Sequence, residues 1–418
     1  GEAAAGTTRA DTAPADTLPR AVLVLARGAD TLRLRWPLDL WILQPGELPV
    51  VEARDPPSPA GTDRIVYGRP TSNGTYVWFF HDGLRLPVSG RENGRLRVQL
   101  APELHAWIDR AEQTPLPEGT PPPRARVGTI TLHADSTRVQ VQVALSEPVP
   151  YLVTEDGRRI ELTLYSAYAA TDWVYYGESD AFVREARWRQ EPGGVFVLTL
   201  DLRDEPWGYK AAYDEAGIVL TLRRPPRIDR HHPLRGRRIA VDPGHPPAGA
   251  TGPTSLYEGD VNLAIARKLE SMLVERGAQV ILTRERETDS VPLYVRPLIA
   301  ESADAEVLVS IHNNALPDGI RPFDRYGSMV FYFHPHSLDL TRALQAHLLR
   351  QLGLRDLGIG RANLALARAT WMPSALTEGA FLMSPEQEAW LRTERFRERY
   401  ARAVLEGIEE FLRRRARE

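Results

Sequence analysis

The stretches VDPGH, residues 241–245, and SIHNN, residues 310–314, each place a histidine directly after an apolar run that is typical of a buried β-strand. Such runs alternate with amphipathic helical patterns throughout residues 237–418. In VNLAIARKLESMLVERG, residues 261–277, apolar side chains recur at helical spacing. Alternating strands and helices predict an α/β domain with a largely parallel or mixed sheet flanked by helices. In such sheets functional groups gather at the carboxyl ends of the strands.

The same pattern predicts the order of elements in this C-terminal region. Gly277 is suited to end the first helix because glycine adopts left-handed backbone conformations readily. Since the pattern is complete, we expect residues 237–418 to fold alone. Strands are expected at 237–241, 278–284, 306–312, 327–333, 363–368 and 374–380, and helices at 261–277, 295–303, 337–353 and the arginine-rich C-terminal segment.

Composition excludes several classes of protein and site. The formal net charge of −3 over 418 residues argues against nucleic acid as a partner. The chain has no cysteine, so any metal must be held by histidine and carboxylate groups. No apolar stretch is long enough for a transmembrane segment. No signal peptide is visible, and if the protein is exported we expect its signal to be absent from this sequence.

His245, Glu258 and His312 form a candidate metal site. Two histidines and a glutamate are one known ligand set of hydrolytic zinc, which keeps a fourth position for water. Their spacing is too irregular for a single helix, so only the fold could bring them together. Each residue also has an ordinary alternative role. A histidine after a strand can be a satisfied polar residue, and a glutamate at a helix start favours the positive end of the helix dipole.

Five separated motifs favour the metal site over these ordinary roles. They are IAVDPGH, EGDVNLAIARKL, GAQVILTRERET, LYVRPLIAESADAEVLVSIHNNA and MPSALTEGAFLMSPEQE, in this order along the chain. The series resembles the zinc-dependent N-acetylmuramoyl-L-alanine amidases of bacterial cell walls, over residues 237–412. The resemblance implies Zn²⁺ as cofactor, His245, Glu258 and His312 as its ligands, and Glu378 as the catalytic carboxylate.

Two departures from the family pattern affect loops near the expected site. The family usually has a glycine pair after the first histidine, where this chain has Pro246 and Pro247. Proline fixes φ and removes amide donors, so we expect a differently shaped loop. Many members have a serine-asparagine pair after the catalytic glutamate, where this chain has LMS at 382–384. This second departure concerns local loop contacts and not Glu378.

Other polar residues have two possible roles each. Asp242 either supports a metal ligand or caps a turn, and Arg296 either braces the site or pairs with a surface acid. The pair at 313–314 either lines the cleft or suits a turn. We expect His334 and His336, in the connection between a strand and a helix, to be solvated.

The first 225 residues are rich in alternating β patterns. Residues 64–108, with NGTY and a closing HAWI, resemble bacterial Src-homology-3-like barrels. STRVQVQVALSEPVPYLV, residues 136–153, resembles the AMIN-type β-sandwich found in front of some cell-wall amidases. The expected domains are a disordered leader at 1–20, a β-rich module at 21–118 with the Src-homology-3-like barrel at 61–115, an AMIN-like wall-targeting sandwich at 126–225, a linker at 226–236 and the zinc amidase domain at 237–418.

The resemblance implies hydrolysis of the amide bond between N-acetylmuramic acid and L-alanine in the peptidoglycan stem peptide. The expected setting is periplasmic or extracellular, with peptidoglycan as the main partner and an envelope or divisome protein as a further possible partner of the β modules. Two alternatives stay open. The ligand set alone also suits a zinc carboxypeptidase or another wall peptidase, and the fold could belong to an inactive wall-binding protein, although Glu378 argues against inactivity.

Overall fold

The computed structural model describes residues 48–55, 65–177, 182–315 and 326–416, which form two compact units. The first unit holds mainly residues up to Arg124, and the second mainly residues from Ala125 onward. The leader expected at 1–20 lies outside the described residues. Among those described, no helix combines the length and the apolar character needed to cross a membrane.

The described residues of the first unit contain β-strands and no helix. Its main sheet has the strand order β6-β5-β4-β1-β7, and β2 pairs separately with β3. Along β5 buried and half-buried residues alternate, which is the period of a strand with one face on the core. The Src-homology-3-like identity of this module stays a prediction. The strands are β1 (Val50–Ala53), β2 (Ile65–Gly68), β3 (Trp78–His81), β4 (Arg85–Glu92), β5 (Arg95–Ala101), β6 (Leu104–Asp109) and β7 (Gln113–Pro115).

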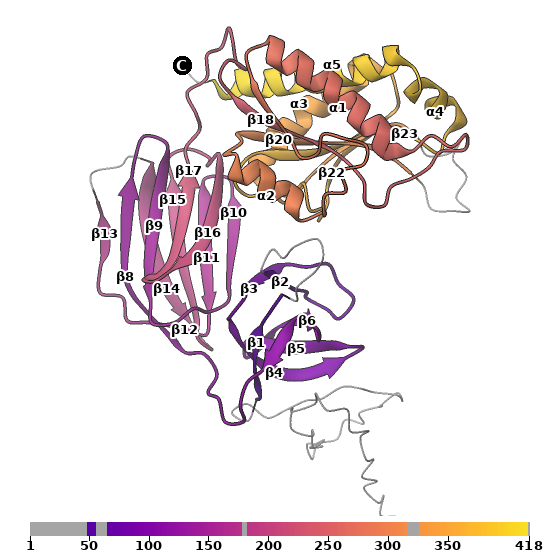
Figure 1. Ribbon diagram of the computed structural model, residues 1–418. Helices are drawn as coiled ribbons and strands as arrows, with labels where there is room; N and C mark the ends of the chain where they lie inside the picture. Colours follow the sequence, from indigo (N-terminus) through magenta and orange to yellow (C-terminus); the bar gives the residue numbers. More distant parts are fainter. Residues whose placement is uncertain (1–47, 56–64, 178–181, 316–325, 417–418) are drawn as a thin grey trace, which may run out of the picture. The chain divides into compact units, whose positions relative to one another are not determined.

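The second unit begins with a β-sandwich of two sheets (Figure 1). One sheet has the order β10-β11-β15-β14; the other has the order β12-β8-β9-β17-β16, with β13 also paired to β8. Its AMIN-like identity and targeting role stay predictions. The strands are β8 (Ala125–Ala134), β9 (Arg138–Leu145), β10 (Tyr151–Asp156), β11 (Arg159–Tyr165), β12 (Ala167–Ala169), β13 (Val174–Tyr176), β14 (Val183–Glu191), β15 (Val195–Leu202), β16 (Gly208–Asp214) and β17 (Gly217–Arg223).

The C-terminal part of this unit is the α/β domain that the sequence predicts. Its six-stranded sheet has the order β19-β18-β20-β23-β21-β22, and only the pairing of β21 with β23 is antiparallel among these strands. The predicted fold class, a mixed sheet flanked by helices after an all-β region, is confirmed. The elements are β18 (Arg238–Pro243), α1 (Glu258–Glu275), β19 (Gln279–Leu282), α2 (Val295–Ser302), β20 (Val307–Asn314), β21 (Ser328–Tyr332), the 3₁₀ turn η1 (Pro335–Ser337), α3 (Leu338–Leu352), β22 (Asp356–Arg361), β23 (Ser374–Phe381), α4 (Pro385–Leu391) and α5 (Glu394–Arg415).

Both faces of this sheet are covered, so its central strands are apolar on both sides. Ile239, Val241 and Val309 share a buried cluster with residues of α1, α3 and α5, and these helices lie together in Figure 1. Ala240 and Leu308 belong to a second cluster, which also contains Ala300 of α2. Continuous apolar runs such as VLVSI are expected for strands buried on two faces. The layered core fixes the carboxyl ends of β18, β20 and β23 next to one another.

One local prediction in this domain is wrong, and one helix was not predicted. Residues 363–368 form turns and not a strand, and the edge strand is β22 at Asp356–Arg361. In the predicted strand the consecutive apolar residues Ala365, Leu366 and Ala367 are buried but belong to no strand; instead, Arg368 N donates to Leu364 O within a turn. The short helix α4 was not expected. It begins with proline at its first position, where the missing amide hydrogen is not needed.

The sandwich and the α/β domain share a buried contact within the second unit. The Trp207 indole nitrogen donates to the Glu306 carbonyl at 2.7 Å, and its ring lies 5.3 Å from the Phe411 ring, centroid to centroid. Arg223, the last residue of β17, donates to the Trp371 carbonyl at 3.1 Å. Trp207 therefore belongs to the core of the C-terminal domain, although it precedes that domain in the chain.

This contact also overturns the expectation that His334 and His336 are solvated. Both are buried, at 8% and 5% exposure. His336 Nδ1 lies 2.6 Å from Glu155 Oε2, and His334 Nδ1 lies 3.2 Å from the Tyr209 hydroxyl. Burial, and then the neighbouring His336, hold the pKa of His334 well below its usual range. The sandwich covers the connection that the sequence alone suggested was open to water.

Candidate metal centre and active site

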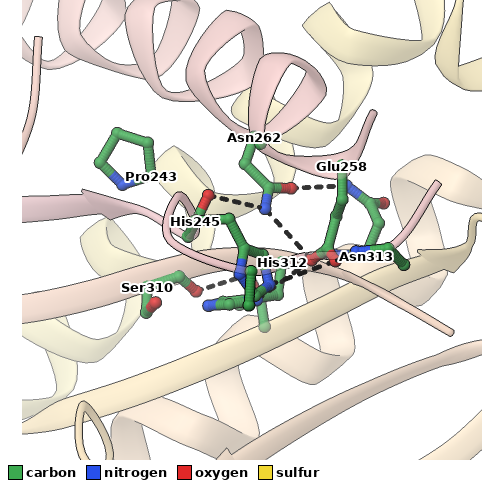
Figure 2. Close-up of polar contacts among 12 residues, drawn as sticks. Pro243, His245, Glu258, Asn262, Ser310, His312 and Asn313 are labelled. Carbon is green, nitrogen blue, oxygen red and sulfur yellow. Dashed lines mark hydrogen bonds and ion pairs between the residues drawn. The ribbon is translucent and has the colours of Figure 1, made fainter. Parts of the chain in front are cut away.

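The structure brings His245, Glu258 and His312 together. One ligand atom from each lies within 4.8 Å of the others. His245 Nε2 is 3.2 Å from Glu258 Oε2, and His312 Nδ1 is 3.1 Å from Glu258 Oε1. The two imidazole rings meet edge to face, with centroids 4.9 Å apart. Figure 2 shows the side chains converging, with Glu258 on α1, His312 on β20 and His245 just beyond the end of β18.

Strand register sets the positions of the two histidines. β18 and β20 run parallel, and Pro243 is aligned with Ile311, so His245 emerges just beyond the end of β18 beside His312. His312 itself lies inside β20, two residues before its end. Gly244 is required between them, because a Cβ atom there would lie 2.3 Å from Cε1 and Nε2 of the His312 ring. The glycine of VDPGH therefore permits the close approach of the two imidazoles.

Glu258 is the first residue of α1 and is only 4% exposed. Its Oε1 accepts hydrogen bonds from the Asn262 side chain at 3.2 Å and from the Asn313 amide at 3.3 Å, and its Oε2 accepts from the Ala250 amide at 3.2 Å. Burial alone would raise the pKa of Glu258, but hydrogen bonds and charge from the two histidines hold it well below its usual range. The carboxylate is therefore ionised and held in one orientation.

The ring of His245 is oriented by the chain that follows it. Its Nδ1 lies 3.3 Å from the Pro247 carbonyl, which can only accept, so Nδ1 carries the proton in this contact. The Nε2 atom then faces Glu258, 3.2 Å from its Oε2. For His245, burial favours the neutral ring, but the hydrogen bond and charge of Glu258 outweigh burial and raise its pKa. The expected departure at Pro246 and Pro247 thus takes part in orienting the first histidine.

Glu378 lies beside His312 on the neighbouring strand. It is the register partner of His312 in the parallel pair β20 and β23, so both side chains project from the same face of the sheet. The residue is half-buried, but its Oε2 atom is shielded and accepts no hydrogen bond from any group in the described residues. Burial, and then the negative charge of Glu258, raise the pKa of Glu378 well above its usual range.

Asp242 and Arg296 both lie in the interior. Asp242 is fully buried and accepts hydrogen bonds from Ser310 at 2.5 Å and from Arg296 at 2.9 Å, and a further one from Thr283. Arg296 also donates to the Pro243 carbonyl at 2.8 Å. Of the two roles considered for Arg296, the structure therefore shows the bracing contact and not a surface ion pair.

Asn313 and Asn314 contact different parts of the domain. Asn313 is buried, and its side chain donates to Asn262 at 3.0 Å. Asn314 is half-buried and contacts the Met329 sulfur at 3.8 Å. Asn313 therefore supports the network around Glu258, while Asn314 lies two residues beyond His312 on the same face of β20.

The sequence analysis missed Asn262 and Tyr400. The Tyr400 hydroxyl donates to the His312 carbonyl at 2.8 Å, and a Cβ on Gly379 would lie 2.2 Å from the Tyr400 ring. Asn262 lies one helical turn after Glu258, and this spacing of i and i+4 was the available signal for it. Tyr400 lies in an amphipathic helix, where an aromatic residue is usually part of the core.

Known proteins share this domain. The family model for N-acetylmuramoyl-L-alanine amidase matches residues 239–410. The germination-specific N-acetylmuramoyl-L-alanine amidase of Bacillus subtilis is 31% identical over 194 residues, which cover 42% of this chain and 80% of that protein. The amidase AmiC of Neisseria meningitidis is 30% identical over 246 residues, which cover 46% of this chain and 59% of that protein.

Among solved structures, the amidase AmiC2 of Nostoc punctiforme is 30% identical with a TM-score of 0.40, covering 42% of this chain and 97% of that one. The catalytic domain of the amidase CwlV from Paenibacillus polymyxa is 33% identical with a TM-score of 0.40, covering 42% and 98%. The matched residues 239–410 span β18 to α5 and include His245, Glu258, His312 and Glu378. The chain belongs to the N-acetylmuramoyl-L-alanine amidase family.

Proposed function

We propose that this cell-wall amidase is zinc-dependent and hydrolyses the amide bond between N-acetylmuramic acid and L-alanine of the peptidoglycan stem peptide. The observation that carries the proposal is one arrangement of side chains. Two imidazoles and an ionised carboxylate converge, and a second carboxylate with an unpaired buried oxygen projects from the same sheet face beside His312.

The three converging residues fit zinc by their chemistry. With its proton on Nδ1, His245 turns Nε2 toward the Glu258 carboxylate at 3.2 Å, where either a second proton or a metal cation makes the contact favourable. Tetrahedral zinc with donors at 2.0–2.1 Å separates those donors by about 3.3 Å. The 3.2 Å from His245 Nε2 to Glu258 Oε2 and the 3.1 Å from His312 Nδ1 to Glu258 Oε1 are close to that spacing, and one ligand atom from each of the three residues lies within 4.8 Å of the others.

Each protein group then has a defined task. Zinc, when bound, supplies a Lewis acid for the scissile carbonyl and lowers the pKa of water to about 7. Glu378 Oε2 accepts a proton from the attacking water and delivers it to the departing amine nitrogen of L-alanine. A buried carboxyl with a raised pKa suits this shuttle, because it takes up and releases a proton nearer to neutral pH than an exposed glutamate does.

The setting of the reaction follows from the substrate. We infer that the protein is exported and acts in the periplasm or outside the cell, and that its N-terminal β modules hold it on peptidoglycan or on an envelope protein. These placements rest on the family's substrate and on the resemblances of the two modules.

Digestion of purified sacculi by the full chain tests the proposed bond. New free L-alanine amino ends, found by amino-terminal labelling and mass spectrometry, support the amidase. Other new amino ends mean a wall peptidase, and binding without any release means an inactive wall protein. Zinc analysis of the same protein, with one zinc per chain expected, tests the cofactor separately.

A further inference from the structure

We propose that Arg284 and Arg296 act together as positioning residues that hold the loop carrying His245 in its metal-binding form. The proposal rests on the proposed zinc site. We call residues 242–247 the His245 loop. Neither arginine was a predicted ligand or catalytic group, and both are only 2% exposed. They bring two cations beneath a loop whose side chains supply a single carboxylate, that of Asp242.

Arg296 contacts the His245 loop on both sides of the histidine. Its Nη1 donates to Asp242 Oδ1 at 2.9 Å and to the Pro243 carbonyl at 2.8 Å, and its Nη2 donates to the Pro246 carbonyl. One planar guanidinium therefore spans the residues before and after His245. The Nε of Arg296 donates to the Val291 carbonyl at 3.0 Å, which fixes the guanidinium from behind.

Arg284 connects the His245 loop to the helix that carries Glu258. Its Nε donates to the Pro243 carbonyl at 2.9 Å, and its Nη2 donates to the Gly244 carbonyl at 3.3 Å. The same Nη2 donates to the Gly259 carbonyl at 2.5 Å, in the first turn of α1. Arg284 thus sets the separation between the first histidine and the carboxylate that faces it.

The His245 loop needs such external donors because its own chain cannot supply them. Pro246 and Pro247 have no amide hydrogen. His245 has a φ of 59°, a left-handed conformation that is unfavourable for a residue with a side chain. Cations beneath the loop draw the carbonyls of residues 243, 244 and 246 inward. The imidazole of His245 is then free to face Glu258.

Burying two neighbouring guanidinium groups is itself unfavourable. Burial, and then the charge of Arg296, lower the pKa of Arg284. An arrangement with this cost implies a compensating role, and the hydrogen bonds to Asp242, Pro243, Gly244 and Pro246 identify this role as fixing the conformation of the His245 loop. Lysine keeps the charge but lacks the planar fork of donors, so it can satisfy only part of this pattern.

The test uses the full chain with Arg284→Lys and Arg296→Lys. Zinc affinity is measured by competition with a chromogenic chelator, and the visible spectrum of the Co²⁺-substituted protein reports ligand geometry. Loss of a group that orients a ligand typically weakens metal binding about 10- to 100-fold. We expect that loss in each variant, with an altered Co²⁺ spectrum.

Arg223→Lys is the matched control. Arg223 is also buried, at 8% exposure, and also donates to backbone carbonyls, but these belong to Ala305 and Trp371 at the sandwich contact. We expect this variant to unfold at lower temperature while its zinc affinity stays within about twofold of the parent. A purely structural effect of losing a buried arginine would instead weaken zinc binding in all three variants alike.

The outcomes separate the two proposals. A parent protein that binds no zinc overturns the metal site itself. A parent that binds zinc, with both site variants folded and within twofold of its affinity, overturns only the positioning role. A variant that unfolds without metal is titrated with zinc while its circular dichroism is followed. If the variant refolds only at a zinc concentration tens of times higher than the one that saturates the parent, the result supports the proposal. If it refolds at the zinc concentration that saturates the parent, the result contradicts it.

Discussion

Replacing Gly244 by alanine tests the close approach of the two histidines. The added Cβ would lie 2.3 Å from Cε1 and Nε2 of His312 and 2.7 Å from its Cδ2. Carbon atoms in contact prefer about 3.5 Å or more, so the ring or the loop must move by about 1.2 Å. Side chains that bind a metal or a substrate tolerate a displacement of only about 0.5 Å from their working positions. We therefore expect Gly244→Ala to weaken zinc binding by about 100-fold or more, beyond the usual effect of an indirect support.

The assay is a chelator competition on the folded full chain, with Gly128→Ala as the control. Gly128 lies in β8 of the sandwich, where a Cβ would meet the Ala144 Cβ at 3.4 Å, an ordinary contact. We expect the control to keep the parent's zinc affinity. If folded Gly244→Ala protein also kept that affinity, the His312 ring would have room to move. Gly244 would then not be required for the close approach of the two histidines.

Four further substitutions test the proton transfer, the zinc ligands, the hydrogen bond of Tyr400 and the buried core. Glu378→Gln should lower turnover of soluble muropeptides by about 10² to 10⁴ with zinc still bound, and a loss below about tenfold would place the proton transfer elsewhere. His312→Ala should lose stoichiometric zinc in metal analysis, and full retention would remove it from the ligand set. Tyr400→Phe should lower the free energy of unfolding by about 0.5–1.5 kcal/mol in urea titration, through its hydrogen bond to the His312 carbonyl, and no change would mean that water replaces the hydroxyl. Trp207→Ala should lower it by about 3–5 kcal/mol without changing zinc affinity, and a negligible loss would contradict its place in the α/β core.

The contribution of Trp207 also revises one expectation from the sequence. Residues 237–418 contain the complete alternating pattern, which indicates a domain that folds alone. The structure adds Trp207 and Arg223 from the sandwich to the buried contacts of that domain. We therefore expect residues 237–418 by themselves to be less stable than the same residues joined to the sandwich.

Much of the α/β domain was predictable because its signals are local. Apolar runs of strand length alternate with helical spacing from β18 onward, and each predicted strand except 363–368 corresponds to an observed one. The failure at 363–368 has a physical cause. A short continuous apolar run such as LALA is equally suited to a strand and to an irregular segment that packs against the core, and only pairing with a neighbouring strand decides between them.

The candidate ligands could be proposed from sequence, but most of the contacts that support them could not, and for Arg296 a bracing role was only one of two alternatives. His245, Glu258 and His312 follow recognisable motifs, whereas the arginines beneath the His245 loop act through backbone carbonyls, which leave no trace in residue type. His334 and His336 were misjudged for a related reason. Their burial depends on Glu155 and Tyr209, which lie more than a hundred residues earlier in the chain. No local sequence pattern predicts such a contact.

In the proposed mechanism, zinc held by His245, Glu258 and His312 and a proton carried by Glu378 together cut one particular amide bond. The most direct measurement is mass spectrometry of a soluble muropeptide incubated with the full chain, first stripped of metal and then restored with one equivalent of zinc. We expect two products from hydrolysis of this bond, the intact N-acetylmuramic acid sugar and a stem peptide with a free L-alanine amino end. These should appear only after zinc is restored and should be nearly absent with Glu378→Gln. Cleavage between amino acids of the stem peptide, or equal cleavage by the stripped protein, would contradict this mechanism.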